Sequence, residues 1–289
     1  MGYFLGLLSA LFYATGAIFY RVGHRSRPND DGQLVSNSIN AIVLGVCLLF
    51  VTWTSWHLAG FLALIGGGLF GTVFGRFGQL RGIRLVGPTR ASTFSAATPI
   101  PTAIAGWIFL GENVTPIEML GGAITIFGVV QIIRSRSSAW GNEPVPRRYY
   151  VIALGAPLWF GIAVFLRKWG IERMPGAVIG AFVGSAAGVI AMLLWSAARR
   201  QMGSHVRRAI AQPPWAFCAA GCTSAAALLT QFWALARIEA WVVGILAGTV
   251  TIWTPILSRV FLKQDEAISK RLIGNIGIVF LGVVVIAAS

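Results

Sequence analysis

Three arginines lie close together in the stretch "GRFGQLRGIR", residues 75–84, directly after a long apolar run. If that run crosses a membrane, an arginine near its centre costs about 2.5–3.5 kcal/mol unless the side chain reaches a polar cavity or the interface. Arg76 is the deepest of the three, and its guanidinium is suited to pair with a carboxylate or a phosphate. We expect Arg76, with Gln79 one turn further on, to bind a substrate. The alternative is that Arg76 reaches the interface together with Arg81 and Arg84, which we expect to anchor a turn there.

Aromatic side chains form a second group of candidates. Tyr13 and Tyr20 lie on the first apolar run, and Trp159 lies on a later run with similar residues. Their rings offer stacking and cation–π contacts to an amino acid or a heterocycle. The alternative is that the three rings pack in the protein core or at the membrane interface.

Hydroxyl groups follow one another in "PTRASTFSAATPIPTAIAG", residues 88–106. Two prolines in this run, Pro99 and Pro101, remove backbone donors and should kink a helix, which frees carbonyl groups toward a cavity. We expect the polar side chains here to face substrate, together with a tryptophan in the matching run "GTVTIWTP": Thr93, Ser95, Thr98 and Trp253. The alternative is that the hydroxyl groups bond to their own helix.

Several kinds of catalytic and cofactor site are absent from the sequence. It contains no G-x-x-x-x-G-K-[ST] phosphate loop and no G-x-S-x-G nucleophile turn. Cys218 and Cys222 are one helical turn apart, but no histidine or acid stands beside them, which favours packing over metal binding. Nearly all of the nine acidic residues lie at the ends of apolar runs. We expect no enzymatic activity, no cofactor and no metal site.

The composition indicates a helical membrane protein with many spans. Of the 289 residues, 56% are hydrophobic and 11% are charged, and the mean hydropathy is +0.74. Soluble domains carry about 25% charged residues. The net charge of +14 comes mainly from short clusters between apolar runs, as in loops that face anionic lipid head groups. Because no soluble basic domain exists to carry it, nucleic-acid binding is not expected.

The elements that must position these residues are apolar runs, each of about 20 residues and long enough to cross a bilayer. One sizeable polar break, residues 134–148, divides them into two groups of five. The ten predicted spans are 3–22, 34–55, 58–80, 88–110, 116–134, 149–167, 174–198, 214–235, 241–262 and 270–288.

The two groups are related in sequence. Residues 11–23 align without gaps on 158–170, and residues 75–87 align on 230–242, which places Arg76 opposite Gln231. We therefore expect a first repeat at 1–134, a linker loop at 135–148 and a second repeat at 149–289. Because each repeat has an odd number of spans, the second must enter the membrane from the other side. Such inverted repeats are typical of transporters that bind substrate between the repeats near the midplane, and Gln231 becomes a candidate contact there.

Several motifs resemble the EamA-type branch of the drug/metabolite transporter superfamily. They are the P-x(12)-E of "PIPTAIAGWIFLGE" (99–112), the following helix with Gly121 and Gly128, and the helix openings "ALFYATGAIFYR" and "PLWFGIAVFLRK". The resemblance covers nearly the whole chain and implies an all-α membrane protein of ten transmembrane helices in two inverted five-helix repeats. It also implies transport of small metabolites, commonly amino acids moved outward. In the second half, "FLKQDE" stands where "FLGE" is usual.

Taken together, the sequence predicts a secondary active transporter that exports a small polar metabolite, an amino acid or a related solute, by alternating access. One alternative is an exchanger of organic or phosphorylated anions, and another is a membrane scaffold or subunit that transports nothing. The expected partners are a small-molecule substrate, membrane lipids, and either a coupling proton or a counter-substrate.

The orientation in the membrane has two conflicting predictions. Most lysines and arginines follow the first, third, fifth, seventh and ninth spans, so the positive-inside rule places both termini outside the cell. The resemblance places them in the cytoplasm. In either case we expect a multi-pass protein of the inner or plasma membrane.

Overall fold

The computed structural model describes residues 1–26, 32–52, 56–86, 91, 94, 97–110, 115–134, 147–198, 215–261 and 270–287. Helices are the only regular secondary structure in these ranges. The long elements of the first half are α1 (Gly2–Ser26), α2 (Gln33–Leu48), α3 (Leu58–Gly68), the π-helix η1 (Leu69–Gly75), α4 (Arg76–Val86), α6 (Pro99–Leu110) and α7 (Pro116–Arg134). Those of the second half are α8 (Arg147–Arg173), α9 (Ala177–Ala198), α11 (Trp215–Leu235), α12 (Ala240–Gly248), α13 (Val250–Phe261) and α14 (Lys270–Ala287).

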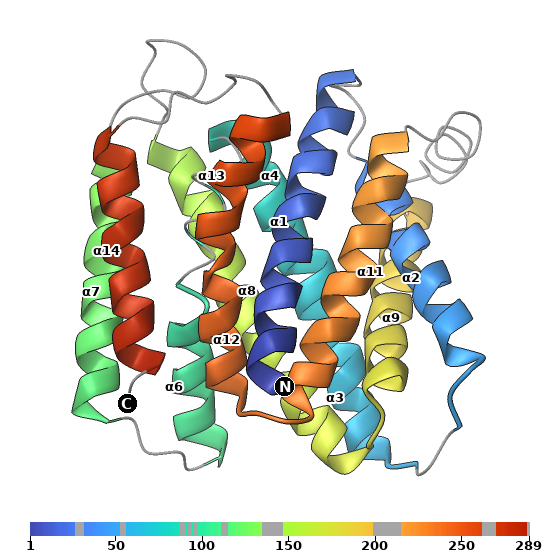
Figure 1. Ribbon diagram of the computed structural model, residues 1–289. Helices are drawn as coiled ribbons and strands as arrows, with labels where there is room; N and C mark the ends of the chain where they lie inside the picture. Colours follow the sequence, from blue (N-terminus) through green and yellow to red (C-terminus); the bar gives the residue numbers. More distant parts are fainter. Residues whose placement is uncertain are drawn as a thin grey trace.

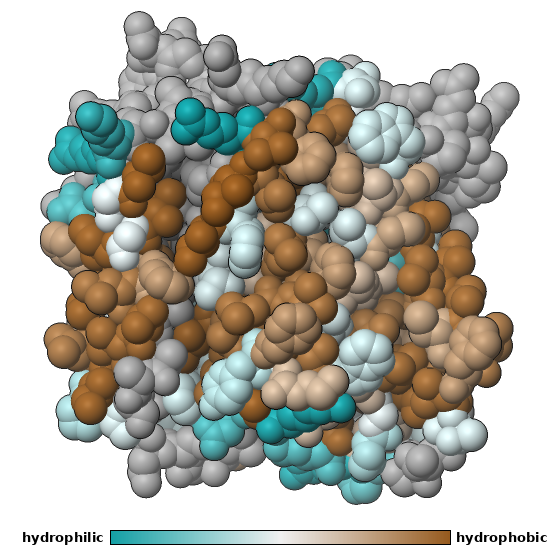
Figure 2. Space-filling view, viewed as in Figure 1, coloured by the Kyte–Doolittle hydropathy of each residue, from teal (hydrophilic) through white to brown (hydrophobic). Residues whose placement is uncertain are grey.

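The protein is a multi-pass membrane protein. Six helical stretches in the described ranges are long and apolar enough to cross a bilayer: Gly2–Ser26, Leu58–Val86, Arg148–Arg173, Ala177–Ala198, Trp215–Leu235 and Ala240–Phe261. Shorter apolar helices lie at 33–48, 99–109, 119–128 and 273–282. Hydrophobic residues predominate across the middle of the face shown in Figure 2, and many large aliphatic and aromatic side chains are exposed, as expected of a surface that faces lipid.

The helices of the two halves contact one another in reciprocal pairs. The first helix of the first half, α1, packs on α11, and the first helix of the second half, α8, packs on α3, η1 and α4. In the same way α1 contacts α13 while α8 contacts α6, and the last helices of the two halves, α7 and α14, pack together. Both termini lie at the same end of the bundle in Figure 1.

Two small residues allow α3 and α9 to approach closely. A Cβ atom on Gly68 would overlap the backbone of Gly184, so neither helix could come this near with a larger residue at position 68. One turn along, a Cβ on Gly188 would lie 2.8 Å from Cβ of Thr72. This contact fixes η1, which follows α3 directly, against the second half of the chain.

The stretch 75–84 was expected to contain a turn, and that expectation is wrong. The helical rod runs without a break from Leu58 through η1 and α4 to Val86. The two glycines in this stretch are packing positions, because Gly78 lies against Ala156 of α8 and Gly82 lies against Ala153. With these glycines buried in a helix contact, nothing in the stretch stops the helix before residue 87.

The expected kink at Pro99 and Pro101 coincides with a break in the helix: residues 91 and 94 are helical, residues 97 and 98 form a turn, and α6 begins at Pro99. Pro99 is the first residue of α6, so both prolines lie in the first turn of a helix and not in its interior. Proline is favoured at that position because its missing N–H would have no helical partner anyway. The helical rod of the second half has a break of its own, since α12 ends at Gly248 and α13 begins at Val250.

Candidate substrate site

A buried polar cluster lies where α1, α2, η1, α4, α8 and α11 meet. It surrounds a cavity of about 20 Å³, and we call its lining residues the central cluster: Tyr13, Asn37, Asn40, Gly71, Thr72, Arg76, Phe160, Arg167, Ser224 and Leu228. Residues from both halves of the chain contribute to it. It therefore occupies the position between the halves at which the sequence predicts a binding site.

Arg76 enters the central cluster from the first turn of α4. Its side chain is only 8% exposed, and Nη2 donates a hydrogen bond of 3.1 Å to Oγ of Ser36 on α2. The Nε atom is buried and has no hydrogen-bond partner among the described residues. Arg76 follows the π-helix η1, and π-helical turns often occur at functional sites because they shift the side chains that follow. The arginine predicted to bind substrate thus lies inside the bundle.

A second arginine in the cluster, Arg167 of α8, was not among the predicted site residues. It is 4% exposed, and Nη1 donates to Oε1 of Gln231 at 2.7 Å. The hydroxyl of Tyr13 donates to the same oxygen at 3.3 Å. The sequence interpretation ended the sixth span at residue 167, but α8 continues to Arg173, which places Arg167 well inside the helix. Gln231, the predicted counterpart of Arg76, therefore orients the second guanidinium.

Gly71 of η1 makes room for Arg167. A Cβ atom at position 71 would overlap the Arg167 guanidinium and would lie 3.1 Å from Cβ of Ala163. The π-helix thus leaves a gap between side chains on the surface of the continuous helical stretch Leu58–Val86. The guanidinium from α8 fills this gap.

One face of α2 supplies the remaining polar groups. Gln33, Ser36, Asn37 and Asn40 follow one another at helical spacing and are all buried. Nδ2 of Asn37 donates to the backbone carbonyl of Thr72 at 3.4 Å and to Sδ of Met192 at 3.1 Å. The Oδ1 atoms of Asn37 and Asn40 are buried without a hydrogen-bond partner in the described chain. A polar stripe at i, i+3, i+4 and i+7 in an otherwise apolar helix is the sequence signal that could have identified this face.

A larger cavity lies between α1, α2 and α4, near the end of the bundle where α1 ends and α2 begins. Its volume is about 410 Å³, and it is lined by Tyr20, Gln33, Phe77, Leu80, Arg81, Arg84 and Leu85. We call it the outer cavity. Nε2 of Gln33 donates to the Thr72 carbonyl at 3.5 Å, so the amide of this outer-cavity residue reaches a residue of the central cluster. Arg81 and Arg84, expected only as anchors of a turn, lie on the wall of this cavity.

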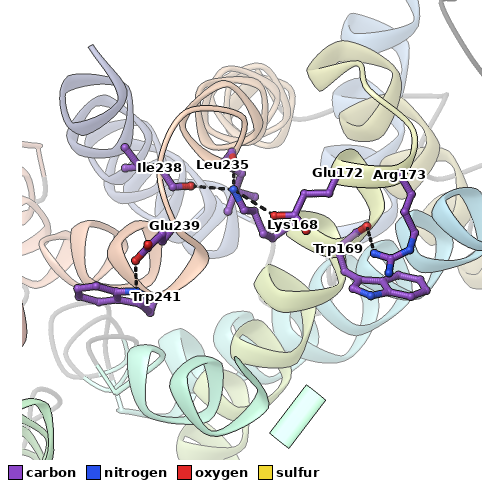
Figure 3. A network of polar contacts seen from close by, with 8 residues as sticks. All are labelled: Lys168, Trp169, Glu172, Arg173, Leu235, Ile238, Glu239 and Trp241. Atoms are coloured by element: carbon purple, nitrogen blue, oxygen red, sulfur yellow. Dashed lines mark hydrogen bonds and ion pairs between the residues drawn. The ribbon is translucent and has the colours of Figure 1, made fainter. Parts of the chain in front are cut away.

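The opposite end of the bundle is joined by a different polar network, shown in Figure 3. Nζ of Lys168 on α8 donates to the carbonyl groups of Leu235 at 3.0 Å and Ile238 at 3.2 Å, where α11 ends. The same ammonium forms an ion pair with Glu172 at 3.4 Å. A cation at a helix C-terminus satisfies carbonyl groups that have no partner within the helix. Lys168 therefore fastens α8 to the end of α11.

The other predicted site residues lie outside the central cluster. Tyr20 lines the outer cavity, while Gln79, 9% exposed, is one turn beyond Arg76. Trp159 stacks on Phe70, with ring centroids 5.6 Å apart. Two further candidates are also placed: the Thr98 carbonyl accepts a bond from Thr102 at 2.9 Å, and Trp253 packs against the small buried group around Ala14, as Tyr13 does. Thr93 and Ser95 lie outside the described residues.

Comparison with known proteins identifies the family. The EamA-like transporter family matches residues 1–134 and 147–288. The chain belongs to this family. EamA-like transporters are part of the drug/metabolite transporter superfamily, so this protein is a membrane transporter by family, as the sequence motifs indicated.

Two individual proteins are similar to this EamA-like transporter. An uncharacterized transporter of Archaeoglobus fulgidus (strain ATCC 49558 / DSM 4304 / JCM 9628 / NBRC 100126 / VC-16) is 34% identical over 103 residues, which are 34% of this chain and 37% of that protein. The chain therefore spans little more than a third of that relative's length. A crystal structure described only as that of a protein matches with a TM-score of 0.68 over 98% of this chain and 95% of the other, at 17% identity, and this likeness shows the fold.

Proposed function

We propose that this protein is a secondary active transporter that exports a small polar metabolite bearing a carboxylate, with the central cluster as its substrate site. The observation that carries the proposal is the pair of buried guanidinium groups, Arg76 and Arg167, at the junction of the two halves. Arginine forms strong, oriented hydrogen bonds with carboxylates and phosphates. Buried charges in membrane helices are costly and typically mark a substrate or ion pathway.

The arrangement of the helices supports transport by two inverted repeats. The reciprocal contacts of α1 with α11 and of α8 with α3, η1 and α4 are those that a two-fold axis between the halves would produce. In Figure 1 α1 and α8 run in opposite directions along the bundle. We propose that the six long apolar stretches and the four shorter apolar helices together make ten membrane spans. Inverted repeats of this kind move substrate by rocking about a central site.

The sizes of the two cavities support alternating access. The central cavity of about 20 Å³ has room for about one water molecule, whereas sites for organic ligands measure about 300–1,000 Å³. The bundle must therefore open around the central cluster before a metabolite can bind. We propose that the outer cavity of about 410 Å³ is the entrance on one side, and that the Lys168 contacts keep the other side closed.

The distribution of charge supports export. Basic residues gather at one end of the bundle, which we call the basic end: His24 and Arg25 close α1, Arg84 closes α4, Arg148 is near the start of α8, and Lys270 and Arg271 begin α14. The positive-inside rule assigns this end to the cytoplasm. The outer cavity lies at the basic end, so a solute from the cytoplasm would enter there.

An exchanger of organic or phosphorylated anions is the second candidate. Arg81 and Arg84 on the wall of the outer cavity favour it, because they add positive charge along the route to Arg76 and Arg167. Fields of one sign in a cleft raise the local concentration of ions of the opposite sign. Trans-stimulation by the same anion on the far side would distinguish exchange from one-way transport.

Uptake into proteoliposomes tests the proposal. The purified full chain is assayed with a mixed panel of amino acids, hydroxy acids and phosphorylated solutes, beside Arg76→Gln and the control Arg237→Gln. Arg237 is exposed and donates only to the carbonyl of Trp233 on its own helix among the contacts described. We expect saturable uptake that Arg76→Gln abolishes and the control retains. Equal uptake by all three proteins would reject the site, and no uptake of any solute would favour a scaffold.

A further inference from the structure

Three buried polar atoms around the central cavity lack hydrogen-bond partners among the described residues: Nε of Arg76 and the Oδ1 atoms of Asn37 and Asn40. Their side chains are 8%, 0% and 4% exposed, and all three line the cavity. Buried polar groups in folded proteins are almost always hydrogen-bonded, so a set of them around one cavity indicates a ligand. The ligand must offer an acceptor to one cationic donor and a donor to two neutral amide oxygens.

The orientation of the Asn37 amide leaves its oxygen available to this ligand. Its Nδ2 atom donates to the Thr72 carbonyl at 3.4 Å and to Sδ of Met192 at 3.1 Å. Neither the carbonyl nor the thioether can donate a hydrogen bond, so the amide nitrogen, and not the oxygen, must point toward them. The oxygen is therefore the atom that remains for the cavity.

The positive charge around the cavity favours a ligand whose hydrogen-bond donor is uncharged. Arg76 and Arg167 both line the cavity, and the sequences of α1, α2, α3, η1, α4, α8 and α11 contain a single acidic residue, Glu172. Glu172 lies near the end of α8, has 46% of its side chain exposed and pairs with Lys168. A ligand ammonium group would meet two guanidinium charges with no carboxylate from these helices to balance it. Two hydroxyl groups, each with one O–H donor, satisfy the two asparagine oxygens without a charge.

We propose that the substrate is the anion of a small dihydroxy acid, whose carboxylate binds Arg76 and whose two hydroxyl groups donate to Asn37 and Asn40. This assignment rests on the proposed function of the central cluster as a transport site. It replaces the amino acid favoured by the sequence with the hydroxy acid of the same carbon skeleton. Phe160 and Leu228 line the apolar part of the cavity and suit a short carbon chain.

Pairs of solutes that differ only in the group on one carbon test the proposal. Uptake of glycerate is compared with serine, and lactate with alanine, in proteoliposomes that contain the full-length wild-type protein. Because unpaired polar groups in the site penalise the wrong analogue, we expect kcat/KM for each hydroxy acid to exceed that of its amino acid by about tenfold or more. Equal or faster uptake of the amino acids overturns the hydroxy-acid assignment and leaves transport intact.

An added carboxylate gives a second test with a different readout. Asn37→Asp places a negative charge in the cavity that Arg76 also lines, so the ratio of glycerate to serine uptake should fall by about tenfold or more. Asn40→Asp makes the same change one turn further along α2 if the first variant is not stable in detergent. Asn275→Asp is the matched control, because Asn275 is also buried but lies on α14, outside the cluster, and should keep the wild-type ratio.

The remaining outcomes separate this inference from the proposed function. If the wild-type protein moves another solute of the panel but neither hydroxy acid, the hydroxy-acid assignment fails while transport stands. If Asn37→Asp and Asn40→Asp both keep the wild-type ratio, the asparagine oxygens do not contact the substrate and the assignment fails. If no solute is moved by wild-type protein, the proposed function fails with it.

Discussion

Replacing Gln231 by glutamate or by leucine separates the electrostatic role of the central cluster from its packing. Oε1 of Gln231 accepts hydrogen bonds from Arg167 at 2.7 Å and from Tyr13 at 3.3 Å. Gln231→Glu keeps the shape of the side chain and both bonds, but it adds a negative charge directly beside one of the two guanidinium groups. Gln231→Leu keeps the site uncharged at this position and removes the acceptor.

Gln231→Glu should lower the transport efficiency, whereas Gln231→Leu should lower the stability of the protein. If the substrate carboxylate binds about 6 Å from residue 231, the added charge costs about 2.8 kcal/mol at an effective dielectric constant of about 20, or about a hundredfold in kcat/KM. The glutamate variant should therefore unfold no more easily than wild type yet transport the anion about a hundredfold less efficiently. The leucine variant should lose about 2–4 kcal/mol of stability, because a charged and a neutral hydrogen bond lose their acceptor.

Uptake kinetics in proteoliposomes and thermal unfolding of the same preparations measure both effects. Thr230→Val is the control on the neighbouring position, since the Thr230 hydroxyl donates only to carbonyls of its own helix, Ala226 and Ala227, among the contacts described. Its kcat/KM should stay within about twofold of wild type. A Gln231→Glu protein that transports the anion with wild-type kcat/KM would refute the claim that positive charge at this cluster binds the substrate.

Three further predictions concern the gap at Gly71, the Lys168 contacts and the orientation. Gly71→Ala should displace the Arg167 guanidinium and reduce uptake by about tenfold or more, and wild-type uptake by this variant would contradict the prediction. The control is Gly274→Ala, because a Cβ atom at position 274 meets nothing within 4 Å. It should leave uptake unchanged and stabilise α14 by up to about 1 kcal/mol. Lys168→Met should lower the free energy of unfolding by about 2 kcal/mol, because the carbonyls of Leu235 and Ile238 lose a charged donor, and an unchanged melting temperature would show that these contacts contribute nothing. In a cysteine-free background, a membrane-impermeant thiol reagent applied to intact cells should label Arg237→Cys and not Lys270→Cys, and the reverse pattern would place the termini in the cytoplasm.

The sequence predicted the family, the helical bundle and the burial of Arg76 because these depend on strong local signals. Apolar runs of membrane length and motifs shared between the halves are visible without tertiary structure. The length of α4 was less accessible. Gly78 and Gly82 disfavour a helix in isolation, but they serve as packing positions once α8 lies against them. This contact with a helix about 70 residues away in sequence cannot be predicted from the residues around the two glycines.

The composition of the site was predicted only in part. Arg167 was assigned to a helix end because charged residues usually mark the end of a span, yet its burial depends on the gap at Gly71, on a distant helix. The stripe of Gln33, Ser36, Asn37 and Asn40 is a local signal, because these polar side chains recur at helical spacing in an otherwise apolar helix. Conversely, Trp159 has the residue type of a substrate contact, but its ring stacks on Phe70. Residue type alone does not say which face of a helix meets a cavity.

Protection of a thiol in the central cluster by substrate tests most directly whether the transported solute binds there. Ser224 lines the central cavity and is 1% exposed, and its hydroxyl donates to the Ala220 carbonyl of its own helix at 2.6 Å. Ser224→Cys, with the three native cysteines replaced, should react slowly with a small thiol reagent during transport. We predict that a saturating concentration of the transported anion slows this reaction, and that a solute outside the substrate panel does not. A reaction rate that the transported anion leaves unchanged would contradict the account.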